Sequence, residues 1–270
     1  MTLFRLFSFA WMGLSLLLVL FKQRWERFFP RLIPEWIDSS RPPLQPPSLF
    51  HLWGTDELGR DVLLRLLFGT GYSLAFSFLV ATVTCCLGMI FGVLLSIAPP
   101  RIKRGLNLGT DTLASLPFLP LALICLTFYP SNLLILGLLK SLLSWGPLAQ
   151  LVRMESELLL AGPIIQAARS QGIPRIRILW RHLLPLLLPL GFIFFPLLLF
   201  STILTISTLD YFGLGFPIPT PTLSELFRQF QDNSECWWLF LFPFFVTTGL
   251  LWNLQTSKKR AWIPLQQQAY

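Results

Sequence analysis

Residues 166–185 read QAARSQGIPRIRILWRHLLP, a basic, helix-forming segment that lies between two long apolar stretches. Gly172 interrupts the segment, and apolar residues alternate with the cations that follow it. The whole polar loop, residues 152–182, is longer than a simple turn and shorter than an independent domain. We therefore expect this loop to meet a partner in the water phase beside a membrane.

The composition indicates a membrane protein. The chain is 54% hydrophobic and 13% charged, with a mean hydropathy of +0.64, whereas soluble domains carry about 25% charged residues. A helix that crosses a bilayer needs about 20 mostly apolar residues. The sequence predicts an all-α integral membrane protein with six transmembrane helices, at Leu6–Phe21, Tyr72–Ala98, Leu106–Tyr129, Ser131–Leu151, Leu183–Leu209 and Trp237–Trp252.

These spans divide the chain into four predicted parts. They are a first transmembrane helix (1–21), an extracytoplasmic loop or lobe (22–70), a core with spans two to six and the loop 152–182 (71–255), and a tail (256–270). The first run also resembles a signal peptide, with Arg5 ahead of an apolar stretch. No small-residue cleavage site follows it, which favours an uncleaved span.

The distribution of cations predicts the orientation. Six spans place both termini and the loops 101–105 and 152–182 on one side, which then holds twelve Lys and Arg against eight on the other. Because cytoplasmic loops carry the excess of cations, we expect cytoplasmic N- and C-termini. The net charge of +8 has the same explanation and does not indicate a nucleic-acid partner. The cations in 22–31 oppose this orientation, and the other loops outweigh them.

The 152–182 loop carries signals of two short helices. Pro163 fits near the start of a first helix through QAARSQ, and Gly172 is typical of a helix C-terminus. Pro174 suits the first turn of a second helix, which runs into span five. A solvated cationic loop would explain the charges but not the apolar residues of the first helix, Ile164, Ile165, Ala167 and Ala168. If these are exposed, a partner is needed to cover them.

Three segments together resemble a known family. Gln166-Ala167-Ala168, then Gly172, His182 and Pro185, is similar to the cytoplasmic "EAA" loop of ABC-importer permeases of the peptide and nickel branch. GTDELGRDVLLRLLFG (54–69) resembles the segment that enters span two in DppC, OppC and YejE-like subunits. LDYFGLGFPIPTPTLSELF (209–227) resembles the segment after their span five. The resemblance covers about residues 50–255, and it departs from the family at Gln166, where a glutamate is usual, and in the C-terminal tail.

The resemblance implies a type I ABC importer permease in a bacterial inner (cytoplasmic) membrane, forming half of a translocation path for peptides. It implies a heterodimer with a homologous permease subunit, two ATPase subunits or one fused ATPase, an extracytoplasmic solute-binding protein, and the lipid bilayer around them. ATP and Mg would be used by those partners, and this chain would bind no cofactor. The loop 163–185 would couple to the ATPase through Gln166, Ala167, Ala168, Arg169, Gly172, His182 and Pro185, with Gly172 setting the angle. The segment before span two contributes Gly54, Thr55, Asp56, Gly59, Arg60 and Asp61.

Polar residues inside or near the spans leave alternatives open. Lys140 and Asp111 fall within predicted spans, where a charge costs roughly 2.5–3.5 kcal/mol. Either lines the path, or it reaches the interface by snorkelling. In GTDELGRD, a cap at Thr55 or Asp56 with ion pairs is favoured over a metal or catalytic cluster.

The sequence contains no motif for catalysis or metal binding. It has no G-x-x-x-x-G-K-[ST] loop, no H-E-x-x-H, no G-x-S-x-G and no C-x-x-C. We therefore expect a transporter subunit that is not itself an enzyme. The alternatives are an importer of nickel or another solute, a membrane-embedded enzyme, and a secondary carrier.

Overall fold

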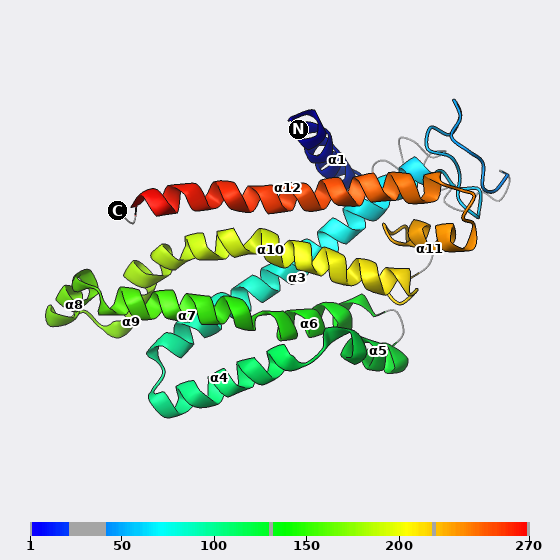
Figure 1. The fold of residues 1–270 in the computed structure, drawn as a ribbon. Coiled ribbons are helices and arrows are strands. Elements are labelled where there is room, and N and C mark those ends of the chain that lie inside the picture. The colour runs from blue at the N-terminus through cyan, green and yellow to red at the C-terminus, as the bar shows by residue number, and fades with distance from the viewer. Residues whose placement is uncertain (1, 22–41, 130–131, 218–219, 269–270) are drawn as a thin grey trace. The chain divides into compact units, whose positions relative to one another are not determined.

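The computed structural model describes the backbone of residues 2–21, 42–129, 132–217 and 220–268. Side chains are described within 8–21, 42–129, 132–217 and 220–253, apart from positions 9, 164, 169, 175, 176, 180 and 182. The regular elements of this part of the chain are helices (Figure 1), namely α1 (Thr2–Leu20), α3 (Val62–Ile97), α4 (Pro100–Ser115), α5 (Phe118–Phe128), α6 (Leu133–Ser144), α7 (Gly146–Ala161), α8 (Pro163–Ser170), α9 (Arg175–Ile178), a π-helical turn (Leu179–Leu183), α10 (Leu184–Tyr211), α11 (Glu225–Asp232) and α12 (Trp238–Gln268).

Three stretches of helix in the described residues are long and apolar enough to cross a bilayer: Val62–Ile97, Leu133–Ala161 and Leu184–Tyr211. α4 and α5 together qualify as a fourth, with a bend of 78° between them. Ala10–Leu20 and Trp238–Asn253 are apolar but shorter. The all-helical membrane fold is therefore confirmed, while the count of six spans stays a prediction.

The start of α3 differs from the sequence-based expectation. The helix begins at Val62, well before the predicted start of span two at Tyr72. Asp61 caps it, because the Leu64 N–H donates to Asp61 Oδ1 at 3.1 Å. The expectation that Thr55 or Asp56 caps this helix is wrong, because both residues lie in the irregular segment before it, where Thr55 forms an isolated β-bridge with Asp61.

The third predicted span is not one straight helix. α4 ends at Ser115 and α5 begins at Phe118, with Leu116 in an extended conformation (φ −72°, ψ 125°). Leu116 precedes Pro117, and the proline ring disfavours helical dihedrals in the residue before it. The 78° bend therefore follows from one proline.

The chain forms two compact units, one of residues 1–78, 128–133 and 200–257, and the other of 79–127, 134–199 and 258–270. In the second unit α3 packs closely on α7. A Cβ atom built on Gly92 would lie 2.6 Å from Val152 Cβ, and one on Gly88 would lie 2.8 Å from the Leu148 side chain. Gly88 and Gly92, four residues apart in α3, thus form a smooth face on which α7 packs.

Candidate functional site

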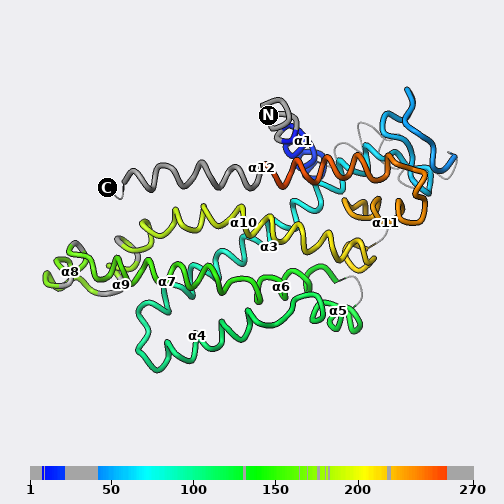
Figure 2. Tube along the Cα trace, viewed as in Figure 1, coloured from blue at the N-terminus to red at the C-terminus, as the bar shows by residue number. Residues whose placement is uncertain are grey.

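The 152–182 loop folds as a helical hairpin in the second unit. Figure 2 shows the trace running along α7 into the short α8, turning, and returning through α9 and the π-helical turn into α10. The predicted first helix through QAARSQ is confirmed as α8. Pro174 comes just before α9, and its carbonyl accepts the N–H groups of Arg177 and Ile178 at 2.9 and 3.2 Å. Pro174 therefore caps the second helix.

Gly172 ends α8 in the way its position predicts. Its φ is +74°, in the left-handed region that L-residues rarely occupy. The Ile173 N–H donates to the Ala168 carbonyl at 3.2 Å, the bond expected when a glycine closes a helix C-terminus. Among the described residues, apart from its chain neighbours, no atom lies within 4 Å of a Cβ built on Gly172. The backbone angle therefore favours glycine here, whereas the available space does not.

α8 is anchored to the body of its unit by one face. Ile165 and Ala168 are buried in a cluster with residues of α3, α7, α9 and α10 that includes Val152 and Leu187. Gln166 and Ala167 are exposed. The chain itself covers Ile165 and Ala168, so these two residues need no partner to cover them. Gln166 and Ala167 lie on the exposed face of the helix.

The side chain of Gln166 has a role that a glutamate cannot take. Its Nε2 donates to the Ala161 carbonyl at 2.9 Å, at the C-terminal end of α7, where helix carbonyls lack partners. An ionised carboxylate only accepts hydrogen bonds. The departure from the family pattern at this position therefore adds a hydrogen bond between α8 and α7.

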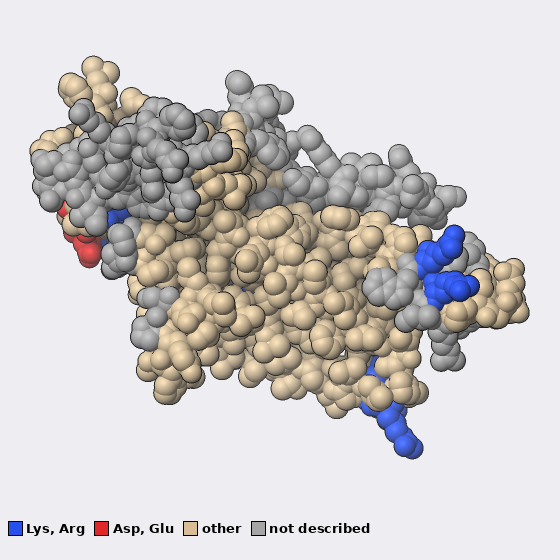
Figure 3. Space-filling view, turned by 180° about the vertical axis from the view of Figure 1, so that it is seen from behind, with Lys and Arg blue, Asp and Glu red and all other residues tan. Residues whose placement is uncertain are grey.

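Basic residues surround the hairpin. Arg177 and Arg181 are exposed, and Lys103 of α4 forms an ion pair with Glu157 of α7. Figure 3 shows Lys and Arg side chains at the α8–α9 end and at the start of α4. The side chains of the candidate residues Arg169 and His182 lie outside the described residues. Pro185 lies in the first turn of α10 and is exposed.

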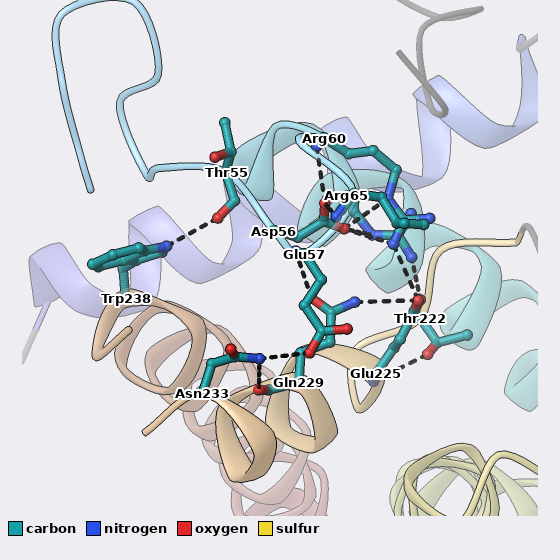
Figure 4. Close-up of polar contacts among 11 residues, drawn as sticks. Thr55, Asp56, Glu57, Arg60, Arg65, Thr222, Glu225, Gln229, Asn233 and Trp238 are labelled. Atoms are coloured by element: carbon teal, nitrogen blue, oxygen red, sulfur yellow. Dashed lines mark hydrogen bonds and ion pairs between the residues drawn. The ribbon is translucent and has the colours of Figure 1, made fainter. Parts of the chain in front are cut away.

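The second candidate segment, 54–61, belongs to the first unit and holds a buried ion cluster (Figure 4). Asp56, Arg60 and Arg65 are only 0, 3 and 4% exposed. Asp56 Oδ2 accepts from Arg60 Nε at 2.7 Å, and its Oδ1 accepts from the Arg60 and Leu58 N–H groups. Glu225 of α11 contacts both guanidinium groups. Two cations and two carboxylates therefore neutralise one another, as buried charges require.

Further polar contacts extend this cluster between 54–65 and α11 (Figure 4). The Glu57 N–H donates to Gln229 Oε1 at 3.4 Å, and Asn233 Nδ2 donates to Glu57 Oε1 at 2.7 Å. Trp238 Nε1 donates to the Thr55 carbonyl at 3.1 Å. Burial, with the nearby Asp232 charge, raises the pKa of Glu57. The contacts join segments more than 150 residues apart in sequence and hold them as one lobe.

The glycines of this segment serve the same lobe. Gly54 and Gly59 have φ of +77° and +74°. A Cβ on Gly54 would lie 2.6 Å from the Gln45 carbonyl oxygen and 2.9 Å from the Trp238 ring. Asp61 also contacts His51, with Oδ2 3.2 Å from Nδ1. All six candidate residues of the segment therefore lie in or beside one scaffold, and the oxygens of Asp56 are occupied by donors.

Half of this cluster was not predicted from the sequence. Arg65, Glu225 and Gln229 are not among the candidates, because each partner lies about 160 residues from the other and no local pattern pairs them. An arginine within an apolar run was the one available signal. A groove of about 680 Å³ among α10, α11 and α12 was also not predicted. Its lining includes Phe227, Phe230 and Phe240, and at its edge the Tyr211 hydroxyl donates to Gln231.

The two polar residues within predicted spans have partners inside the second unit. Asp111 Oδ1 accepts from Gln150 Nε2 at 2.7 Å, and Asp111 is exposed. Lys140 lies within α6, and its Nζ is 5.4 Å from the centroid of the Phe118 ring, within the range of a cation–π contact. α6 continues through Lys140 without a break.

Comparisons with known proteins agree on one family. The chain is 29% identical over 213 residues to the Escherichia coli inner membrane ABC transporter permease protein YejE, and the match covers 79% of this chain but 62% of YejE. It is 32% identical over 227 residues to a putative peptide transport system permease of Brucella suis, covering 78% and 74%. It is 31% identical over 206 residues to the oligopeptide transport permease OppC of Salmonella typhimurium, covering 75% and 68%.

A solved structure shares the fold. A chain of the MetNI methionine ABC transporter, in inward facing conformations, superposes with a TM-score of 0.58 at 19% identity, over 73% of this chain and 94% of that one. Residues 85–254, which include α8 and the whole of α10 and α11, match the family described as the inner membrane component of binding-protein-dependent transport systems. The chain is a member of that family, the binding-protein-dependent transport system inner membrane components.

Proposed function

We propose that this chain is a permease subunit of an ATP-driven ABC importer for peptides, and that it couples to its ATPase through α8 and the residues up to Pro185. The observation that carries the coupling role is the two-faced character of α8. Ile165 and Ala168 fix the helix to a core shared with α7 and α10, while Gln166 and Ala167 remain exposed. A force applied to the exposed face would therefore be transmitted to both spans.

The mechanism requires no chemistry from this chain. Partner ATPases bind and hydrolyse ATP with Mg, and their closure moves α8. Because packed helices shift as rigid elements, α7 and α10 follow, and the path alternates between its two sides. Gly172 sets the angle between α8 and α9, so it sets the direction of that movement.

The assembly that follows has several partners. It contains a homologous permease subunit, two ATPase subunits or one fused ATPase, and an extracytoplasmic solute-binding protein. The names of the similar proteins from Brucella suis and Salmonella typhimurium refer to peptide and oligopeptide transport, which supports peptides over nickel as cargo. Both termini and the α8 hairpin are cytoplasmic in this proposal.

Co-purification tests the coupling role. The chain is extracted from native membranes in mild detergent and its companions are identified by mass spectrometry, for the wild type, Gly172→Pro and Gly172→Asn. We expect ATPase and sister-permease polypeptides with the wild type and with Asn, which tolerates a positive φ, and loss of the ATPase with Pro. Recovery of the chain alone from wild-type membranes would instead favour a carrier or an enzyme.

A transport assay tests the cargo. Uptake of labelled tripeptide and of nickel is compared between cells with and without the gene for this chain. Peptide uptake that requires the chain, with nickel uptake unchanged, supports the proposal. The reverse result assigns the chain to nickel import.

Lys140 and Asp111 remain proposed path-lining residues, and the aromatic groove is the alternative. Lys140→Cys and Phe230→Cys are compared for protection from a thiol reagent by added peptide during turnover. Protection at Lys140 alone supports the original assignment, and protection at Phe230 alone moves the path to the groove.

A further inference from the structure

Lys140 lies well inside a candidate span of the second unit. It is about 10 Å along the axis of α6 from Leu133, the first residue of that helix. The hydroxyl of Ser141, the next residue, donates at 3.4 Å to the carbonyl of Val80, which lies near the middle of α3. An ionisable residue at such a depth in a span marks a functional site by default.

The break between α4 and α5 lies beside this lysine. Lys140 Nζ is 5.4 Å from the centroid of the ring of Phe118, the first residue of α5. Leu116, two positions earlier, has an extended backbone, and Ser115, Leu116 and Pro117 are exposed. Figure 1 shows α5 turning away from α4 at this point. The side chain of Lys140 is therefore directed at a neighbouring helix, at the place where that helix begins.

A charge and an interrupted helix together indicate what this surface faces. Irregular backbone at membrane depth is tolerated only where protein covers it or where it lines a water-filled cavity. The cost of an ionised lysine within a span exceeds what one cation–π contact usually returns, so the Phe118 ring alone does not account for the charge. Acyl chains satisfy neither feature, whereas a hydrated path through the importer satisfies both.

We propose that Lys140, beside the α4–α5 break, binds the C-terminal carboxylate of a peptide as it passes through the importer. This inference rests on the proposed function, which supplies peptide as the cargo. Every linear peptide with a free C-terminus ends in a carboxylate whatever its sequence, so one fixed cation serves cargo of many sequences. An ammonium group binds a carboxylate through charge-assisted hydrogen bonds. The same cation repels a nickel ion, so the site also favours peptide over nickel.

Uptake of two related peptides tests the proposal. Cells with the complete importer are offered a labelled tripeptide with a free C-terminus or the same tripeptide as its C-terminal amide. The binding protein is the same in every strain, so a change in the uptake ratio between strains reports on this chain. Lys140→Met should lower the ratio of free peptide to amide about tenfold, which corresponds to about 1.4 kcal/mol. Lys140→Arg should keep most of the preference, because the charge remains.

Arg101→Met is the matched control. It removes one positive charge from the exposed start of α4, at the other end of that helix from the break, and should leave the ratio unchanged. Lys140→Met replaces a charge within a span by an apolar side chain, so the variant should insert at least as well as the wild type, which an immunoblot of the membrane fraction checks.

Two results overturn the proposal while the importer itself stands. One is an unchanged ratio in Lys140→Met, and the other is an equal fall in the uptake of both peptides, which would give Lys140 a role unrelated to the carboxylate. A strain without the gene for this chain separates the two levels of inference. If that strain takes up both peptides as the wild type does, the proposed function fails, and the carboxylate site fails with it.

Discussion

The geometry of the α8 hairpin depends on one backbone angle, the φ of Gly172. With φ at +74° and no neighbour near its missing Cβ, the position tolerates a side chain but not a different conformation. Gln166 acts at the other end of the same helix, where its amide bonds the last carbonyl of α7. At each of these two positions, one substitution should therefore remove the local role and leave the rest of the fold intact.

Gly172→Pro should abolish coupling while the protein still inserts. Proline fixes φ near −65°, which removes the turn that directs α8. We expect peptide uptake to fall about tenfold or more, with an unchanged amount of protein in the membrane by immunoblot. Gly172→Asn is the control and should keep most activity. Full uptake by the proline variant would remove α8 from the coupling role.

Gln166→Glu should loosen the contact between α8 and α7 in a pH-dependent way. At pH 7 the carboxylate cannot donate to the Ala161 carbonyl, and the loss of one such bond costs about 1 kcal/mol. Hydrogen exchange of the amides in 162–172 should therefore be about fivefold faster than in the wild type. Near pH 4, where a glutamate is about half protonated, the difference should shrink. A difference that is constant with pH would assign the effect to another cause.

At the scale of elements, local patterns predicted the parts of the hairpin but not what they contact. Gly172 and Pro174 act through their own backbone, so the end of α8 and the start of α9 could be predicted from the sequence. The burial of Ile165 and Ala168 did not, because it depends on where α3, α7 and α10 lie. Asp61 rather than Asp56 caps α3 because Asp56 is held by Arg60 and Arg65.

The buried ion cluster should be the most sensitive part of the first unit. Asp56→Ala leaves Arg60 and Arg65 with Glu225 alone, and an unpaired buried charge costs about 3–5 kcal/mol. We expect a strongly lowered midpoint in fluorescence-detected thermal unfolding, or loss of folded protein. Asp232→Asn, an exposed carboxylate on α11, should change the midpoint little. Similar midpoints for both variants would show that the cluster contributes little to stability.

A methyl group added at the α3–α7 contact should lower the stability of the protein. Gly92→Ala places a methyl group 2.6 Å from Val152 Cβ, and overpacking of this kind costs about 1–3 kcal/mol. Gly109→Ala in α4 meets no atom within 4 Å and should be neutral or stabilising, since alanine favours helix over glycine. The same thermal assay compares the two variants. A Gly92→Ala protein as stable as the wild type would contradict the close packing.

For the whole molecule, the hydropathy pattern predicts the membrane-spanning helices, whereas only the distribution of charge predicts their orientation. The described residues supply three or four spans. The count of cations predicts that the α8 hairpin and the start of α4 lie in the cytoplasm and that the lobe of α11 lies outside. The cations at 22–31 argue for the opposite orientation of the first span, and they lie outside the described residues.

Site-directed labelling decides the orientation. In a chain whose four cysteines are replaced, single cysteines at Gln171 and at Glu235, both exposed, are offered a membrane-impermeant maleimide. In intact spheroplasts we expect labelling at 235 only, and in inverted vesicles at 171 only. This pairing is required for α8 to reach a cytoplasmic ATPase while α11 faces an extracytoplasmic binding protein. Labelling at 171 in spheroplasts would invert the topology and exclude the coupling role of α8.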